Sequence, residues 1–247
     1  MTELPEVSPE SRLRAALQYV SSSERLQSAL AAGTYPRPGY VEVLIDQCAV
    51  ERDFLVRDMM TWALTRHPVE LTVPRLLDEL RSPVAQARSQ ALHTLSKIGD
   101  PRGWTAIGPE LLADPNDEVA RSAWRAAVIL VPEGSESDLA THLVTQLGRG
   151  PHDLQSSLTR AISALGAQAD AALEPAEEHS DPVVRLHAVA TRYTIDHPDE
   201  GFDSALFEAE RILAFPAELQ DDAAGQSSES SPDEKAPEDS SGENPPE

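Results

Sequence analysis

The sequence predicts an all-α fold, a right-handed α-solenoid of about six helical hairpins with a capping helix at the C-terminal end. The first observation is a residue that recurs every 30 to 34 positions and is arginine in five of six cases. The second is that residues three, six and seven places later are mostly apolar, which forms one stripe on a helix. The recurring positions are Arg25, Arg57, Arg88, Arg121, Gln155 and Arg185. The stripe comprises Met60, Ala63 and Leu64; Ala91, Thr94 and Leu95; Trp124, Ala127 and Val128; and Leu158, Ala161 and Ile162.

Six pairs of helical segments follow this register. They are expected at 11–20 with 24–32, 40–50 with 53–66, 72–81 with 84–98, 105–113 with 117–130, 138–148 with 153–165, and 169–178 with 182–194. Glycine and proline separate the pairs, as in the turn from Gly33 to Gly39, because they end helices. Asp53, Ser82, Asp117, Asp153 and Asp181 stand where second helices begin, and such side chains accept hydrogen bonds from free backbone amides.

The chain divides into three regions by composition. Residues 1–9 are expected to be disordered, and residues 10–215 form the repeat domain. Its last helix, at 202–215, places Phe202, Leu206, Ala209 and Leu213 on one side and is expected to cap the array. Residues 216–247 contain ten acidic residues and one basic residue. This tail is expected to be disordered because it buries too little apolar surface to offset chain entropy.

The charge balance narrows the classes of partner. With 42 acidic and 20 basic residues the formal net charge is −22, which disfavours nucleic acid and anionic membranes as partners. The single cysteine, Cys48, excludes an internal disulfide. No signal peptide or membrane span is expected, so the prediction is a cytoplasmic protein, monomeric, with a protein or peptide partner and no cofactor.

The repeat pattern resembles HEAT repeats, in particular the short bacterial kind related to phycobilisome-lyase repeats. The matching stretches are 53–64, 87–101, 114–127 and 181–190, and the resemblance covers about residues 10 to 200. It implies an armadillo-like helical fold, which serves scaffolds, transport factors, lyase subunits and some enzymes. In that family an aspartate and an arginine of the second helix form a polar ladder between repeats. Here the ladder is expected to contain Asp53, Arg57, Arg88, Asp117, Arg121, Asp181 and Arg185.

A partner-binding surface is expected on the concave side, which second helices usually line. Offsets of two, five and nine from the recurring residue lie outside the apolar stripe, and they hold aromatic and basic side chains. Trp62 and Arg66 are the expected anchors, since tryptophan and arginine often dominate binding energy. The alternative is that Trp62 packs between repeats and the basic side chains are only solvated. The full candidate set is Met59, Trp62, Arg66, His93, Lys97, Arg125 and Arg160.

No reaction centre is evident in the sequence. No His-Glu dipeptide occurs, and no pair of histidines has the spacing of a catalytic metal motif, so no metal or catalytic residue is expected. Cys48 is expected to act as a small apolar side chain, and Gly99–Gly103 as a turn. The leading hypothesis is therefore a non-enzymatic scaffold or adaptor. The alternatives are a subunit that resembles bilin lyases and an enzyme that resembles HEAT-like DNA glycosylases.

Overall fold

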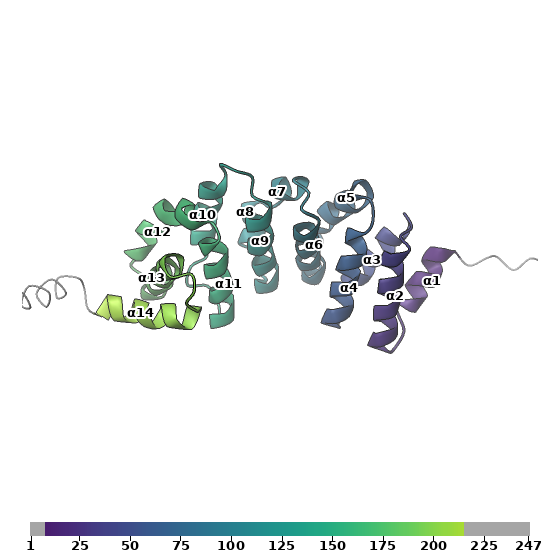
Figure 1. Cartoon of the computed structure of the whole chain (residues 1–247), viewed down its shortest axis with the longest axis horizontal. Helices are drawn as coiled ribbons and strands as arrows, with labels where there is room; N and C mark the ends of the chain where they lie inside the picture. The colour runs from purple at the N-terminus through teal and green to yellow at the C-terminus, as the bar shows by residue number, and fades with distance from the viewer. Residues whose placement is uncertain (1–7, 215–247) are drawn as a thin grey trace, which may run out of the picture. The chain divides into compact units, whose positions relative to one another are not determined.

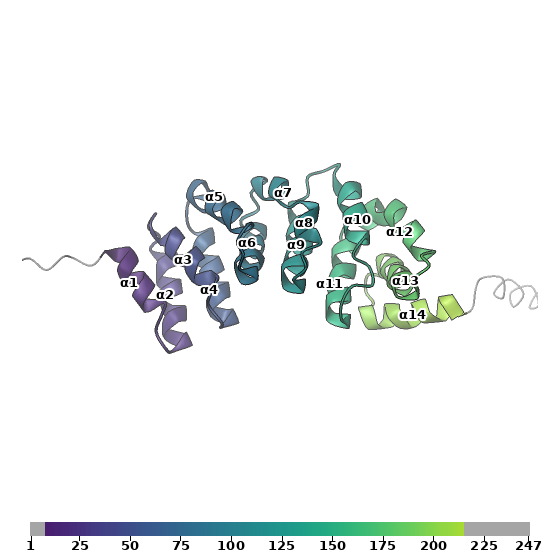
Figure 2. The same cartoon turned by 180° about the vertical axis from the view of Figure 1, so that it is seen from behind.

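The computed structural model describes residues 8–214, and all regular structure in that range is helical (Figures 1 and 2). Residues up to 209 belong to one compact unit, and 210–214 are the described part of a second. The helices are α1 (Pro9–Ala16), α2 (Ser22–Thr34), α3 (Tyr40–Cys48), α4 (Phe54–Thr65), α5 (Val69–Glu79), α6 (Ala85–Ile98), α7 (Arg102–Ala106), α8 (Pro109–Leu112), α9 (Asp117–Leu130), α10 (Glu136–Val144), α11 (His152–Ser163), the 3₁₀ helix η1 (Gly166–Ala169), α12 (Asp170–Glu177), α13 (Pro182–Asp196) and α14 (Phe202–Ala214). The all-helical class and the six helical pairs are confirmed. The predicted N-terminal and C-terminal disordered regions lie outside the described residues, apart from Ser8 and Pro9.

The helices form two layers within the first unit. The second helices of the pairs pack each against the next, in the order α2, α4, α6, α9, α11 and α13. The first helices do the same from α1 through α3 and α5 to α7, and again from α8 through α10 to α12. Each second helix also packs against its own first helix (Figure 1). Every repeat therefore buries its apolar faces against its neighbours, as expected for a stack of hairpins.

The predicted apolar stripe forms the core between the two layers. Of its twelve residues, eleven are at most 5% exposed, and Val128 is half-buried against the same cluster. Polar members are paired, since Thr94 Oγ1 donates to the Gln90 carbonyl and lies 3.3 Å from Thr61 Oγ1. The register that the recurring residue defines in the sequence is thus the register of the folded array.

The fourth first helix differs from the prediction. The segment at 105–113 is two short helices, α7 and α8, which are separated at Ile107 and Gly108. Pro109 lacks a backbone N–H and occupies the first turn of α8, where no such donor is required. Proline therefore begins a new helix here, and the continuous helix expected at this place was wrong.

Three of the five predicted helix caps also differ from the structure. Asp53 and Asp181 cap α4 and α13 as expected. The cap of α9 is Asn116, whose Oδ1 accepts from the amides of Glu118 and Val119, so Asp117 is already inside the helix. Likewise α6 begins after Val84 and α11 after Pro151, each two residues away from the predicted cap at Ser82 or Asp153.

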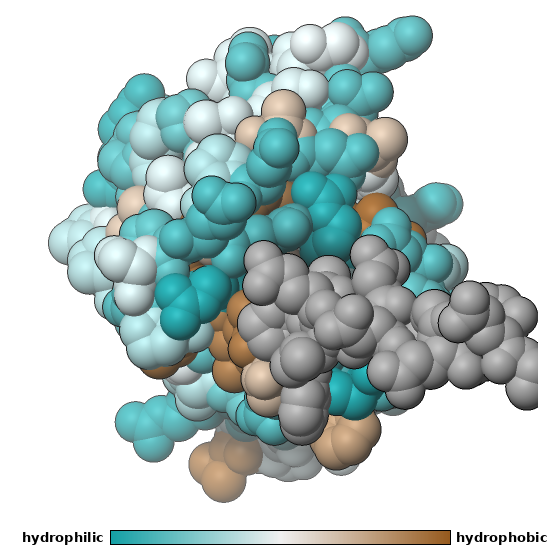
Figure 3. Space-filling model, turned by 90° about the vertical axis from the view of Figure 1, so that its left-hand side faces the viewer, coloured by the Kyte–Doolittle hydropathy of each residue, from teal (hydrophilic) through white to brown (hydrophobic). Residues whose placement is uncertain are grey.

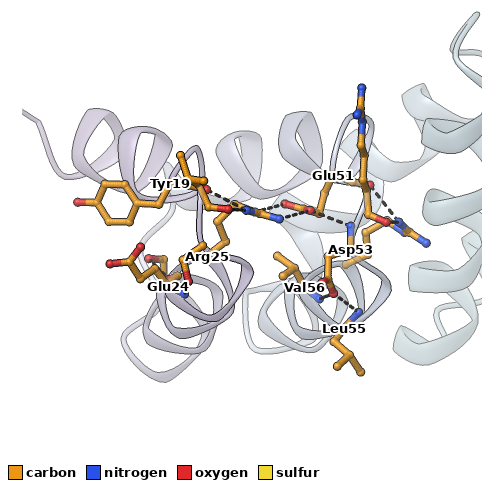
Figure 4. Close-up of polar contacts among 12 residues, drawn as sticks. Tyr19, Glu24, Arg25, Glu51, Asp53, Leu55 and Val56 are labelled. Carbon is orange, nitrogen blue, oxygen red and sulfur yellow. Dashed lines mark hydrogen bonds and ion pairs between the residues drawn. The ribbon is translucent and has the colours of Figure 1, made fainter.

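The recurring residue binds the turn inside its own hairpin. Nη1 of Arg25 donates to the carbonyls of Tyr19 and Val20, at 2.8 and 3.0 Å (Figure 4). Arg57, Arg88, Gln155 and Arg185 donate in the same way to carbonyls five or six residues earlier. These carbonyls lie beyond the last turn of the first helix, where intrahelical donors are lacking. The side chain thus ties the second helix to the turn before it in five of the six pairs; the exception is Arg121, whose turn is bound at the Asp114 carbonyl by Arg149 instead.

Three of these arginines also connect one repeat to the next, but through other acids than those predicted. Arg25 binds both oxygens of Glu51, at 2.7 and 2.9 Å (Figure 4). Arg88 binds Asp114, and Arg121 binds Asp153 at 2.6 Å. Of the expected ladder aspartates, Asp53 and Asp181 cap helices, and Asp117 binds Arg149. Asp53 and Asp181 accept from the first amides of their own helices and so form no link between repeats, whereas Asp117 does join the fourth repeat to the fifth, through Arg149.

Arg25→Gln is expected to lower the free energy of unfolding by about 2 kcal/mol, because it leaves the Glu51 carboxylate, 3% exposed, with one charged partner fewer. Burial alone would raise the pKa of Glu51, but the bonds from Arg25 and from the Asp53 amide hold it below its usual value. The matched control is Arg14→Gln, which breaks an exposed pair with Asp46 and should cost less than about 1 kcal/mol. Equal costs in urea denaturation would contradict this account.

The last described helix packs on α13. Phe202, Ala205 and Ala209 are buried against Ala190, and Leu206 is partly buried beside them. Of the predicted apolar side, Leu213 is 36% exposed, so only its first three members pack as expected. The surface at this end is mostly hydrophilic with small apolar patches (Figure 3). Phe207 of α14 is 65% exposed.

Candidate functional site

Charge is segregated between the two layers of helices. The six second helices contain nine Arg or Lys and six Asp or Glu, whereas the first helices contain four and twelve. Helix α6 has two basic residues and no acidic residue. The layer of second helices is therefore net positive in a chain whose formal charge is −22. Such an arrangement favours an acidic partner on this layer alone.

A hollow of about 440 Å³ lies on the exposed face of three successive second helices, α4, α6 and α9. Side chains of α6 occupy its middle, and side chains of α4 and of the start of α9 flank them. Hydroxyl, amide and charged groups predominate in the lining. It consists of Phe54, Arg57, Asp58, Ala85, Gln86, Ser89, Gln90, His93, Ser96, Asn116, Glu118, Ser122 and Arg125.

The lining overlaps the predicted stripe only in part. Gln90 and His93 stand at the predicted offsets of +2 and +5, whereas most of the other lining residues stand at −3, +1, +4 or +8 from the recurring residue, and no residue at the predicted offset of +9 lines the hollow. Ser89 and Ser122, both at offset +1, are hydrogen-bonded across α6 and α9 at 2.9 Å. By contrast the +2 residues Ala123 and Ser157 are buried between second helices. The sequence analysis therefore missed Asp58, Ser89 and Ser122, which the same register would have located.

Two arginines, Arg57 and Arg125, line the hollow without an ion pair to a described residue, but Arg57 already donates to backbone carbonyls. Arg125 Nε donates to Ser157 Oγ of α11 at 3.2 Å, and no carboxylate of the described residues lies within ion-pair distance of Arg125. Burial lowers the pKa of the Arg125 guanidinium, and so do the like charges of Arg121 and Arg160, while the charge of Glu118 raises it. Arg125 is nevertheless an exposed residue, so an anionic ligand has access to its guanidinium.

The other basic candidates extend this pattern along the layer. Lys97 and Arg160 are exposed on α6 and α11, and Arg66 is exposed at the end of α4. None of the three forms an ion pair with a residue in the range 8–214. His93 lies 3.7 Å from Asp58, but burial and the charge of Lys97 lower its pKa, so this contact is weak at neutral pH.

The two apolar candidates lie beside the hollow and not in its lining. Met59 is half-buried against the core. Trp62 is 39% exposed, and its ring covers Gly33 of α2 so closely that a Cβ on that glycine would lie 2.4 Å from the ring. Trp62 thus both packs between repeats and presents an edge to solvent. The structure brings together His93 and Arg125 and leaves Trp62 and Arg66 outside the hollow.

The described residues show no group arranged for metal binding or nucleophilic chemistry. No cluster of three or more His, Cys, Asp or Glu that suits a metal ion occurs among them. Burial raises the pKa of the Cys48 thiol to about 12, so it stays protonated and unreactive. His187 is buried between α11 and α13 and bonds to Thr159, a packing role. Within the described range no helix combines the length and hydropathy needed to cross a membrane.

Comparison with known proteins gives matches among solved structures alone. No model of a known family and no curated protein matches the sequence. Among solved structures, the complex of CpcE and CpcF of phycocyanin lyase from Nostoc sp. PCC7120 matches with a TM-score of 0.44 and 17% identity. The match covers 92% of this chain and 96% of the other. At this identity the similarity concerns the fold, which is all-helical and built of hairpins, as the resemblance to HEAT repeats predicted.

This match corrects one prediction. The sequence analysis expected a protein that is not an enzyme, and the matched chains belong to a lyase. The expectation was drawn from the lack of a catalytic motif in the sequence. Because an enzyme subunit can contribute binding surfaces while another subunit or the substrate supplies reactive groups, that inference was wrong.

Proposed function

We propose that this chain is a helical-repeat subunit that binds a protein segment on the exposed face of its second helices. The observation that supports the proposal is the hollow across α4, α6 and α9, which three successive repeats build together. An extended surface shared by several repeats suits a polypeptide segment better than a small molecule. The role is compatible with membership of an enzyme complex.

The double variant Trp62→Ala with Arg66→Glu is expected to abolish capture of the partner from native lysate. It removes an exposed aromatic edge and reverses an unpaired charge on the same layer. Circular dichroism should show unchanged helicity. The matched control is Leu71→Ala with Arg37→Glu, which changes an exposed apolar residue and an arginine away from the second helices.

Capture should persist in the control. If the Trp62 and Arg66 variant still captures the partner, these residues do not belong to the interface. A cross-linker at Ser96, in the hollow, then decides whether any protein contacts this layer.

A subunit of a lyase is the second candidate, named by the complex that the fold resembles. The chain's single cysteine cannot supply the thiol for covalent chemistry, because Cys48 is 4% exposed and its thiol pKa is about 12. In a lyase the chain would therefore hold a bilin or its acceptor protein without a covalent bond. Absence of bilin absorbance from protein purified after incubation with the chromophore would count against chromophore binding.

A further inference from the structure

We propose that the hollow binds an acidic segment of a protein partner, with one carboxylate seated at the Arg125 guanidinium and Lys97 and Arg160 as flanking contacts. This inference rests on the proposed function and adds the chemistry of the partner. Three adjacent repeats would each provide one basic side chain, from α6, α9 and α11.

The first argument is charge complementarity. Acidic residues outnumber basic ones two to one along the chain, and basic residues such as Arg75, which binds Glu42 and Glu79, form ion pairs with them. Within residues 8–214 no ion pair is formed by Lys97, Arg125 or Arg160, which lie on three successive second helices. Bases that stay unpaired in so acidic a protein remain available to an external carboxylate.

The second argument is the geometry at Arg125. The bond from Nε to Ser157 Oγ fixes the plane of the guanidinium and leaves both Nη groups without an acceptor in the described chain. Two parallel N–H groups match the two oxygens of a carboxylate, and such charge-assisted pairs are about twice as strong as neutral hydrogen bonds. The Arg125 side chain is thus held in position before the ligand arrives.

The third argument concerns two glutamine side chains that line the hollow, Gln86 and Gln90, and that suit a peptide backbone. Gln86 Nε2 donates to the carbonyls of Cys48 and Glu51, and Gln90 Nε2 donates to Thr61 Oγ1. Both glutamines line the hollow, and neither Oε1 atom accepts a hydrogen bond from the described residues. They can accept hydrogen bonds from backbone N–H groups of an extended segment, as recognition of extended peptides requires.

The acidic residues of the lining favour a protein over nucleic acid. Asp58 and Glu118 flank the hollow, with side chains 58% and 70% exposed. A duplex places a charge about every 1.7 Å along its axis, so its phosphates would meet both acids. A peptide can place carboxylates opposite the bases alone and neutral residues opposite Asp58 and Glu118.

The test is selection of dodecapeptides from a random display library on the immobilised full-length chain. Enriched peptides should contain an excess of Asp and Glu, and raising the salt from 50 to 500 mM should weaken their binding. In Arg125→Gln with Arg160→Gln, the Kd of a synthetic enriched peptide should rise about 10-fold or more, or about 1.4 kcal/mol. Arg37→Gln, which removes one charge away from the second helices, should leave the Kd unchanged.

The outcomes separate the two proposals. Enrichment of neutral or basic peptides, or equal affinity for the double variant with an unchanged melting temperature, would overturn the acidic segment and leave protein binding intact. A 20-base-pair duplex that binds through Arg125 and Arg160 would overturn it in favour of nucleic acid. If no peptide is enriched and the cross-linker at Ser96 captures no protein, the proposed function fails as well.

Discussion

Trp124→Ala is expected to lower the free energy of unfolding by about 3 to 5 kcal/mol, which is the usual cost of removing a fully buried aromatic side chain. The Trp124 ring is 0% exposed, and its Nε1 donates to the Leu112 carbonyl at 2.8 Å. That carbonyl ends α8, the short helix that follows the break at Pro109. The substitution therefore opens a cavity and frees the broken helix of the fourth repeat.

Chemical denaturation measures this effect, and two variants separate its components. Trp124→Phe keeps much of the volume and loses the hydrogen bond, so it should cost about 1 to 3 kcal/mol. Trp104→Ala alters a half-buried tryptophan of the same repeat and should cost less than Trp124→Ala. If Trp104→Ala were the more damaging change, the core would not centre on α9 as the structure shows.

His187 is expected to make stability depend on pH between about 4 and 6.5. Its Nδ1 accepts from the Gly148 amide at 2.9 Å, so in the neutral ring Nε2 holds the proton and donates to Thr159 Oγ1. Burial lowers the pKa of His187 from 6.5 to about 4. Protonation would place a second N–H against the Gly148 amide, which cannot accept it.

The sign follows from the lowered pKa. Between pH 6.5 and about 4 the unfolded chain binds a proton that the folded chain does not, so stability falls as the pH falls. The contribution of neutral His187 to the free energy of unfolding is fully present above pH 6.5, the pKa in the unfolded chain, and is lost as the pH approaches about 4. It amounts to about 3 kcal/mol, since each unit of pKa corresponds to about 1.4 kcal/mol.

His187→Asn separates this effect from the general loss of stability in acid. The asparagine oxygen can accept from the Gly148 amide and does not titrate in this range. His152 and Asp203, which pair at 2.6 Å near the same Phe202 ring, remain in both proteins. The difference in melting temperature between wild type and variant should shrink from pH 7 to pH 5. A constant difference would show that His187 does not titrate between folded and unfolded states.

The fold follows from the sequence because a helix and its buried stripe are local properties. Residues three, six and seven places after each recurring position share one face whatever the neighbours are, so the core around Leu64 and Trp124 was predictable. Pro109 itself is visible in the sequence. Whether it divides the segment into two helices depends on whether the residues on both sides of the break form helices, which the proline alone does not determine. The cap at Asn116 in place of Asp117 shows the usual shift of one residue at a helix end.

The candidate site was less predictable, because it depends on rotation between adjacent helices. A shift of one position along a helix turns the face by about 100°, and the same offset does not face the same way in every repeat. At offset +2, Gln90 lines the hollow, whereas Ala123 and Ser157 are buried between helices. Ser89 and Ser122, at offset +1, were missed, although Arg125 and His93 were included. Partners of charged side chains cannot be deduced from spacing either, since Asp53 and Glu51 stand two residues apart and only Glu51 binds Arg25.

The links between repeats have a consequence for how such a chain folds and changes. Hydrogen bonds from one repeat to the next, such as Arg25 to Glu51 and Gly148 to His187, join residues 26 and 39 positions apart. Closing such short loops costs little entropy, so assembly can start at any hairpin and spread to both sides. A protein connected only between nearest neighbours can also gain or lose a whole hairpin by duplication or deletion while the remaining junctions keep their partners.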